Sequence, residues 1–246
     1  MMLWLVAAFF MTALLYAAVG FGGGSTYAAL LAVSGVDYRL LPMIALACNI
    51  VVVAGSTTRF ARAGITPWRG AIFLTLLAAP AALLGGLTPI EEEAFFLILG
   101  IVLLMTAGAM ILPRRDDEGP ATKSARLVPL AAVPLGYLAG LVGIGGGIFL
   151  APLLHLTRWN TARGIAATAS FFILVNSIAG LTGQILKGGE GRFLLAISQS
   201  LPLLVAVAIG GQIGSLMAFK VLPSRGIRRL TAVLVAVVAI RLLLQF

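Results

Sequence analysis

Long apolar runs without a single charged residue alternate along the chain with short polar stretches. Seven such runs occupy residues 1–36, 40–58, 70–90, 94–113, 127–157, 164–186 and 193–219. Each is close to or longer than the roughly 20 residues that an α-helix needs to cross the hydrocarbon core of a bilayer. A further segment, 227–246, is apolar except at its two ends. The pattern therefore predicts an all-α polytopic membrane protein.

Two of these runs are interrupted by a cluster of glycines. Residues 20–24 read GFGGG and residues 143–147 read GIGGG, within runs of 36 and 31 residues. Such a run is too long for one span and too short for two spans with a turn. Each run therefore predicts a helix, a glycine break and a short second helix that returns to the same side. The expected helical segments are 3–19, 25–35, 40–58, 68–88 and 94–112, then 127–142, 148–157, 164–186, 193–219 and 227–245.

The two glycine clusters also mark an internal repeat. A shift of 123 residues lays residues 20–24 on residues 143–147 and the leucine pair at 30–31 on the leucine pair at 153–154. An internal repeat decides the architecture of a chain. We expect a first transmembrane repeat over residues 1–113, a cytoplasmic linker over 114–126 and a second transmembrane repeat over 127–246, with about five helical segments in each repeat.

Composition supports the membrane interpretation and adds a topology. Hydrophobic residues make up 61% of the 246 positions, charged residues make up only 10%, and the mean hydropathy is +1.10. A soluble domain carries about 25% charged residues. If the linker is cytoplasmic and each hairpin returns to its own side, 13 of the 17 basic residues fall on the cytoplasmic side, in agreement with the positive-inside rule. The exceptions are Arg39, Lys187, Arg192 and Arg241.

This topology gives the two repeats opposite orientations, because each contains an odd number of full crossings. Inverted-topology repeats are typical of secondary transporters. The cytoplasmic loops explain the net charge of +9, so we expect no nucleic acid as a partner. The expected partners are a small anionic substrate and the lipid bilayer, in a bacterial-type inner membrane that the chain crosses several times. The sequence carries no signal for an oligomeric state.

A glycine break at membrane depth favours a binding site. Unwound backbone cannot face lipid, because its free N–H and C=O groups cost several kcal/mol each. The second helix of each hairpin then begins near the midplane, with free N–H groups and the positive end of its dipole directed into a cavity. Two such ends form an anion site. The predicted substrate-binding residues are Gly22, Gly23, Gly24, Ser25, Thr26 and Asn49 in the first repeat, and Gly145, Gly146, Gly147 and Asn176 in the second.

Close helix packing is the competing explanation of the glycines. The chain contains three small-xxx-small pairs, at positions 20 and 24, 143 and 147, and 210 and 214, and such pairs let helices approach closely. We assign packing to Gly210 and Gly214, whereas packing does not require three consecutive glycines within an over-long run. Asn49 and Asn176 have their own competing explanation, an interhelical hydrogen bond worth about 0.6 kcal/mol.

The residue types that are missing narrow the function. All eight acidic residues fall in predicted loops. An ionisable residue inside the membrane is the usual mark of a proton or cation pathway, so a neutral or anionic substrate is favoured. The single histidine, His155, is interpreted as an interfacial residue, and a role as a proton carrier is the alternative. Without a cluster of metal ligands or a nucleophile–base set in the sequence, we expect no enzyme activity, no metal and no cofactor.

The glycine clusters resemble those of the TauE/SafE family of membrane transporters, named for sulfite and organosulfonate export. The second cluster continues to Pro152 and Leu153, as in the family's glycine-then-proline pattern, whereas the first repeat has Ala29 at the corresponding position. The resemblance implies an inner-membrane permease, an exporter of sulfur-containing anions such as sulfite or small sulfonates, and we expect it to work by alternating access. An anion channel and a permease for another small organic anion are the alternatives. Substrate, direction and coupling ion stay open.

Overall fold

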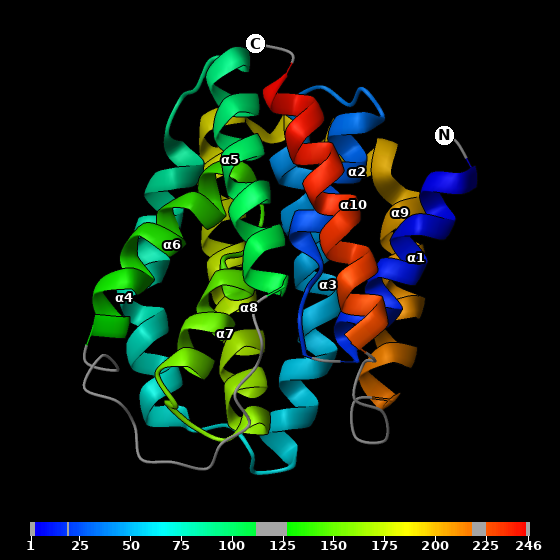
Figure 1. Cartoon of the computed structure of the whole chain (residues 1–246). Helices are drawn as coiled ribbons and strands as arrows, with labels where there is room; N and C mark the ends of the chain where they lie inside the picture. Colours follow the sequence, from blue (N-terminus) through cyan, green and yellow to red (C-terminus); the bar gives the residue numbers. More distant parts are fainter. Residues whose placement is uncertain (1–2, 19, 112–126, 218–224, 245–246) are drawn as a thin grey trace.

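The computed structural model describes residues 3–18, 20–111, 127–217 and 225–244, and these residues form ten α-helices (Figure 1). They are α1 (Leu3–Ala17), α2 (Gly24–Val33), α3 (Leu41–Arg62), α4 (Trp68–Leu87), α5 (Glu92–Ile111), α6 (Val128–Val142), α7 (Gly147–Leu156), α8 (Ala162–Gly188), α9 (Glu190–Met217) and α10 (Arg225–Leu243). Of these, α3, α4, α5, α8 and α9 contain stretches long and apolar enough to cross a membrane. The prediction of an all-α polytopic membrane protein is confirmed. The expected linker, 114–126, lies outside the described residues.

Local sequence explains where several helices begin. α3 has Pro42 in its first turn, where a missing N–H costs nothing. α8 is capped by Thr161, whose Oγ1 accepts a backbone hydrogen bond of 3.2 Å, as favoured N-cap residues do. α5 and α9 carry Glu92, Glu93 and Glu190 in their first turns. The expectation that these three acids lie in loops is wrong, because the positive end of a helix dipole stabilises a carboxylate in the first turn.

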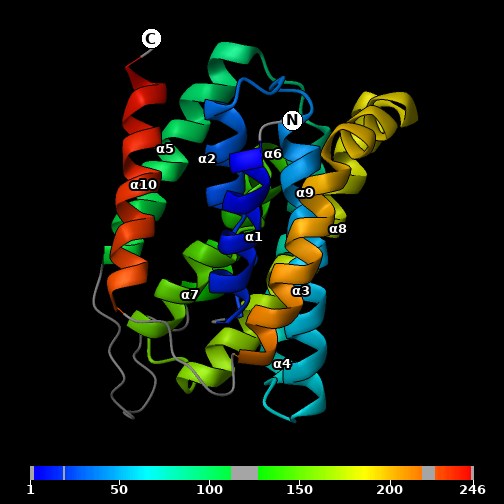
Figure 2. The ribbon, with the colours of Figure 1, turned by 90° about the vertical axis from the view of Figure 1, so that its right-hand side faces the viewer.

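Both expected helix breaks are present. Between α1 and α2 the φ angles of Gly20 and Gly23 are 80° and 83°. Between α6 and α7 the φ angles of Gly143, Gly145 and Gly146 are 82°, 80° and 73°. Glycine adopts these left-handed angles without a steric penalty. The chain therefore turns back inside the bundle, and Figure 2 shows α1 descending and α2 returning toward the same end.

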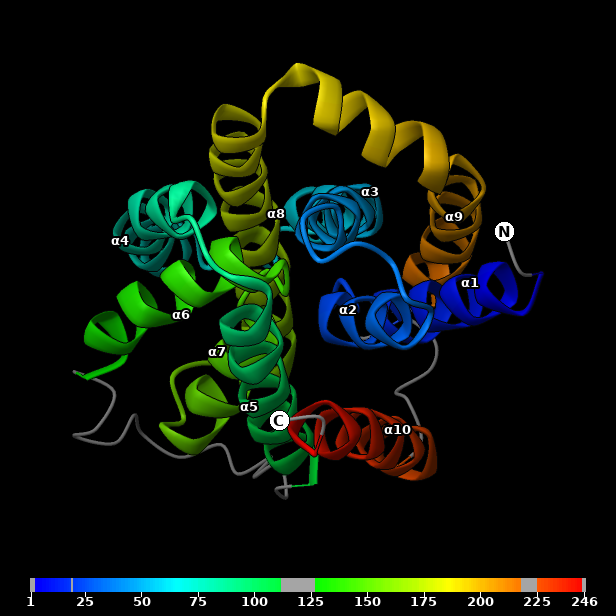
Figure 3. The ribbon, with the colours of Figure 1, turned by 90° about the horizontal axis from the view of Figure 1, so that it is seen from above.

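Helices of the two halves interleave. α4 packs against α6 and α8, and α9 packs against α1 and α3, as the view from above shows (Figure 3). α3 crosses α8, and α5 lies beside α10. Each helix of the first half has a counterpart five helices later in the chain, so that α1 corresponds to α6 and α4 to α9. Exchanging every helix for its counterpart leaves this set of contacting pairs unchanged. Each half therefore depends on the other for its packing.

Backbone contacts bring these interleaved helices together. A Cβ atom on Gly210 of α9 would lie 2.5 Å from the carbonyl oxygen of Phe10, and one on Gly214 would overlap another carbonyl oxygen of α1. This confirms helix packing as the role of Gly210 and Gly214. A close backbone contact at a glycine also joins α6 to α4, because a Cβ atom on Gly140 would overlap the carbonyl group of Ala82.

Candidate functional site

The two helix breaks meet at Asn49 in the middle of α3. A Cβ atom on Gly22 or Gly24 would overlap the side-chain amide of Asn49, and one on Gly145 would lie 2.9 Å from its Nδ2. Asn49 therefore lies against both breaks at once. The carbonyl oxygen of Ile144 approaches the same point, 2.5 Å from the Cβ position of Gly24. A side chain on either glycine of the first break would displace this amide, so close approach explains part of the cluster.

Several polar atoms at this meeting point lack hydrogen-bond partners. The exposed fraction of Asn49 is 0%, yet neither its Nδ2 nor its Oδ1 has a partner among the described residues. The same is true of the Oγ of Ser25, and of the Oγ of Ser177, which lies 3.1 Å from the Cβ position of Gly145. An unpaired buried polar group costs about 1–3 kcal/mol, and most such groups in proteins are paired. Their gathering at one point indicates a place for a polar ligand.

The start of α2 adds backbone donors to this place. The first backbone hydrogen bonds of the helix run from the N–H groups of Thr26 and Tyr27 to the carbonyl oxygen of Gly23, each at 3.0 Å. The N–H groups of Gly24 and Ser25 precede this ladder, and no side chain caps this end of the helix. Two backbone donors thus lie at the positive end of the α2 dipole.

The start of α7 differs from that of α2. The N–H of Gly147 donates to the carbonyl oxygen of Gly145 at 3.0 Å, so one of its first donors is already used. A Cβ atom on Gly146 would lie 3.1 Å from the carbonyl oxygen of Leu135 and 3.1 Å from the ring of Phe172, and one on Gly147 would overlap an isoleucine of α8. These two glycines therefore pack against α6 and α8. The N-terminus of α2 supplies more free backbone N–H groups to the meeting point than the N-terminus of α7.

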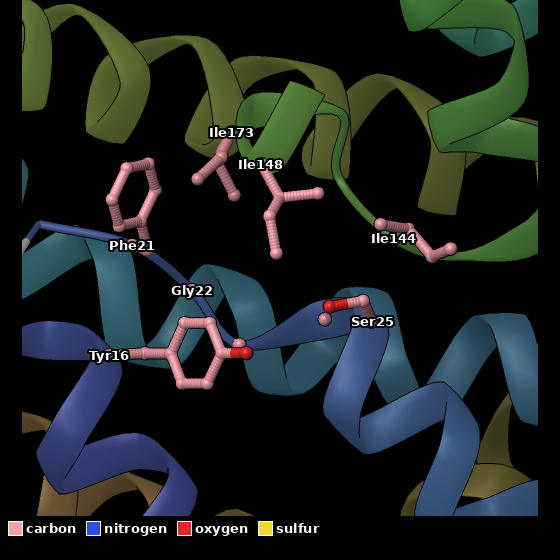
Figure 4. Close-up of a pocket in the computed structure, with 9 residues that line it drawn as sticks. Tyr16, Phe21, Gly22, Ser25, Ile144, Ile148 and Ile173 are labelled. Atoms are coloured by element: carbon pink, nitrogen blue, oxygen red, sulfur yellow. The ribbon is translucent and has the colours of Figure 1, made fainter. Parts of the chain in front are cut away.

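A small cavity lies against the first break (Figure 4). Its volume is about 10 Å³, which is the room that one water molecule needs. The cavity is lined from the first half by Tyr16, Phe21, Gly22, Gly23, Gly24 and Ser25, and from the second half by Ile144, Ile148 and Ile173. The cavity is therefore too small for a larger anion in this structure, and the binding of such an anion would require the walls to move apart.

Two other predicted site residues are bonded elsewhere. The hydroxyls of Thr26 and Tyr16 share a hydrogen bond of 2.9 Å, which ties α2 to α1. The Nδ2 of Asn176 donates to the carbonyl oxygen of Phe172 at 2.8 Å, while its Oδ1 has no partner. Asn176 does not line the cavity, and neither does Asn49, which lies against the lining glycines Gly22 and Gly24.

Sequence reasoning missed five residues that line the cavity. These are Tyr16, Phe21, Ile144, Ile148 and Ile173. Tyr16 carries a usable signal, since it is a hydroxyl-bearing residue four positions before the first glycine cluster in a mostly apolar helix. The isoleucines carry none, because apolar residues are the norm in a membrane helix.

The surroundings of the site carry no negative charge. In the part of the chain that the structure describes, the acidic residues are Asp37, Glu91, Glu92, Glu93 and Glu190, and all lie in loops or first turns. No group of three metal-binding side chains occurs within the same part. Backbone and amide donors without a nearby carboxylate suit an anion.

Similarity to known proteins now decides the family. The family model described as sulfite exporter TauE/SafE matches residues 5–242, a span that includes both helix breaks. The chain belongs to the TauE/SafE family. The membership expected from the two glycine clusters is confirmed, and with its apolar helices the protein is a multi-pass membrane transporter. The family is one of transporters, not of enzymes.

Named relatives agree with this family. The probable membrane transporter protein y4hK of Sinorhizobium fredii is 34% identical over 245 residues, 97% of each chain. The probable membrane transporter protein MJ0441 of Methanocaldococcus jannaschii is 26% identical over 81% of this chain and 78% of its own. The probable membrane transporter protein YunE of Bacillus subtilis is 22% identical over 80% of this chain and 81% of its own. No solved structure is significantly similar to the chain.

Proposed function

We propose that the protein is a secondary transporter that exports small sulfur-containing anions, such as sulfite or organosulfonates, across a bacterial-type inner membrane. The anion is held where the two breaks meet. Its donors are the N–H groups of Gly24 and Ser25, the hydroxyl of Ser25 and the Nδ2 of Asn49. A sulfite or sulfonate group carries three oxygens that accept hydrogen bonds from converging donors. The description of the matching family as sulfite exporters supports this substrate class.

One observation carries the proposal. The amide of Asn49 is fully buried against both breaks and has no partner in the described part of the chain. The competing explanation, an interhelical hydrogen bond, needs a partner on another helix, and Asn49 has none there. An acceptor oxygen of a bound anion would satisfy its Nδ2, and would remove the cost of burying that donor unpaired.

Alternating access between two inverted repeats is the mechanism that fits this site. The exchange of helix pairs between the halves supports a pseudo-twofold relation. Because α4 packs on α6 and α8, and α9 packs on α1 and α3, each moving unit draws helices from both repeats. Rocking of α1, α3 and α9 against α4, α6 and α8 would expose the site to one side of the membrane at a time.

The membrane potential by itself can drive the export of an anion, so little coupling to an ion gradient is needed. For a monovalent anion, a potential of 100 mV, negative inside, favours exit by about 2.3 kcal/mol. A channel would need a continuous pore. The cavity of about 10 Å³ at the breaks has room for a single water molecule, which favours a transporter over a channel.

Charge movement on solid-supported membranes tests the proposal with purified protein in proteoliposomes. We expect saturable currents with sulfite or a short organosulfonate and none with chloride. Ser25→Ala should weaken the apparent affinity by about tenfold, because a hydrogen bond to a charged group is lost. The matched control is Ser215→Ala, because the Ser215 hydroxyl is buried and donates to the carbonyl oxygen of Gln212 in its own helix. Chloride currents as large as those of sulfite, or equal effects of the two variants, would refute the anion site.

A further inference from the structure

A second, larger cavity lies between α1, α2, α3 and α9. Its volume is about 370 Å³. Apolar side chains from the four helices form most of its wall, namely Leu5, Leu31, Ile44 and Leu203. Ser34 and Val36, at and just after the end of α2, also line it, so its mouth lies at the end of the bundle where α1 begins (Figure 1). We call this space the outer vestibule, because the distribution of basic residues predicts that this end is not cytoplasmic.

One layer of side chains forms the floor of the outer vestibule. Four residues further into the bundle, about one helical turn, each of the four helices carries a residue with an exposed fraction of 0%. These floor residues are Phe9, Tyr27, Cys48 and Val207. The rings of Phe9 and Tyr27 stack with their centroids 4.7 Å apart, and they close the space between α1 and α2.

The other side of this floor is the central site. A Cβ atom on Gly23 would lie 3.1 Å from the Cζ of Tyr27 and 3.2 Å from its hydroxyl. That hydroxyl has no hydrogen-bond partner among the described residues. Cys48 directly precedes Asn49 in α3. The stacked rings therefore separate the outer vestibule from the place where the two breaks meet.

The corresponding positions of the second half are buried as well. A shift of 123 residues takes Leu5 to Val128 and Leu31 to Leu154. Val128 and Leu154 belong to one buried apolar cluster together with Leu74 and Ile165. Leu5 and Leu31 likewise belong to a buried apolar cluster.

We propose that the outer vestibule is the exit path of the transported anion and that the Phe9–Tyr27 stack is the barrier across it, an inference that rests on the proposed function. The vestibule wall suits release, because it offers no charge. The hydroxyls of Ser34 and Ser200 donate to carbonyl oxygens of their own helices at 2.6 and 2.7 Å, and the amide of Gln199 is the remaining polar side chain. An anion that passes the barrier meets no strong donor set and leaves.

The chain carries its own reporter for this barrier, because Cys48 is its single cysteine. A negatively charged, membrane-impermeant methanethiosulfonate is added to the outer side of oriented proteoliposomes, without transport substrate. Phe9→Ala should raise the labelling rate of Cys48 by about tenfold or more, because opening the floor admits water and reagent. Phe95→Ala is the matched control, since Phe95 is equally buried in α5 and packs against Tyr38 and Phe96. Unchanged labelling in Phe9→Ala, or an equal increase in Phe95→Ala, overturns the barrier.

A second pair of variants does not depend on the folding of Phe9→Ala. Leu203→Trp narrows the outer vestibule one helical turn above its floor, so both Cys48 labelling and anion current should fall by about tenfold. Leu201→Trp makes the same change on a side chain that is 57% exposed on the outside of α9, and should leave both close to the wild-type values. Wild-type current in Leu203→Trp overturns the exit path. If the wild-type protein moves no anion, the proposed function fails, while Cys48 labelling still decides whether Phe9 and Tyr27 form a barrier.

Discussion

Replacing Asn49 with leucine should make the protein more stable and abolish transport. The two side chains have the same number and branching of heavy atoms, so Asn49→Leu keeps the shape of the side chain against Gly22 and Gly24. The substitution removes an amide whose two polar atoms are buried without partners. A residue that served stability would show the opposite result, because its loss would weaken the fold.

The expected gain follows from the cost of the unpaired amide. The exposed fraction of Asn49 is 0%, so solvent does not relieve that cost, which is about 1–3 kcal/mol for an unsatisfied buried group. A chain of this length changes its melting temperature by about 2–4 °C per kcal/mol. A gain of about 2 kcal/mol therefore raises the melting temperature of Asn49→Leu by about 4–8 °C.

Thermal unfolding in detergent and anion currents in proteoliposomes are measured on the same preparations. Thr106→Val is the control, because Thr106 is fully buried in α5 and its Oγ1 also lacks a partner among the described residues, but unlike Asn49 it is not a nearest neighbour of any glycine in the two breaks. The control should gain stability and keep its current. A lower melting temperature in Asn49→Leu would mean that the amide is paired in the native protein. A wild-type current would mean that the anion does not bind there.

The other expectations concern helix packing and the first hairpin. Gly140→Ala places a methyl group on the carbonyl group of Ala82 and should cost about 1–3 kcal/mol. Gly108→Ala, in α5 with no atom within 4 Å of the new Cβ, should gain up to about 1 kcal/mol; equal melting temperatures for the two variants would contradict the close contact. Tyr16→Phe removes the 2.9 Å hydrogen bond to Thr26, so it should cost about 1 kcal/mol and slow the initial rate of transport. Unchanged stability and rate would show that this bond does not hold the hairpin.

The positions of the helices were predictable because their signals are local. The segment expected at 148–157 is α7, Gly147–Leu156, shifted by one residue at each end. The segment expected to end at residue 58 continues to Arg62, since basic side chains are favourable in the last turn of a helix and do not end it. The glycine breaks were also predictable, because the freedom of glycine to adopt a positive φ is a property of the residue itself.

The candidate site was predictable only in part. Gly22, Gly24 and Ser25 were expected and line the cavity. Asn49 and Asn176 look alike in the sequence, each a polar residue within a long apolar run, yet Asn176 bonds to a carbonyl oxygen of its own helix while Asn49 has no partner in the described structure. That difference in hydrogen bonding depends on the neighbours that each side chain contacts in the folded protein. The sequence around the two residues does not predict those neighbours.

The sequence alone determined that the chain is a helical membrane protein, where its helices break and which family it resembles. These features depend on hydropathy and on backbone freedom over a few neighbouring residues. Only the tertiary structure decided that both breaks meet at Asn49, that the two halves interleave through α4 and α9, and that a cavity of about 370 Å³ lies between α1, α2, α3 and α9. Each of these depends on contacts between residues far apart in the chain, and such contacts leave no periodic pattern in one sequence.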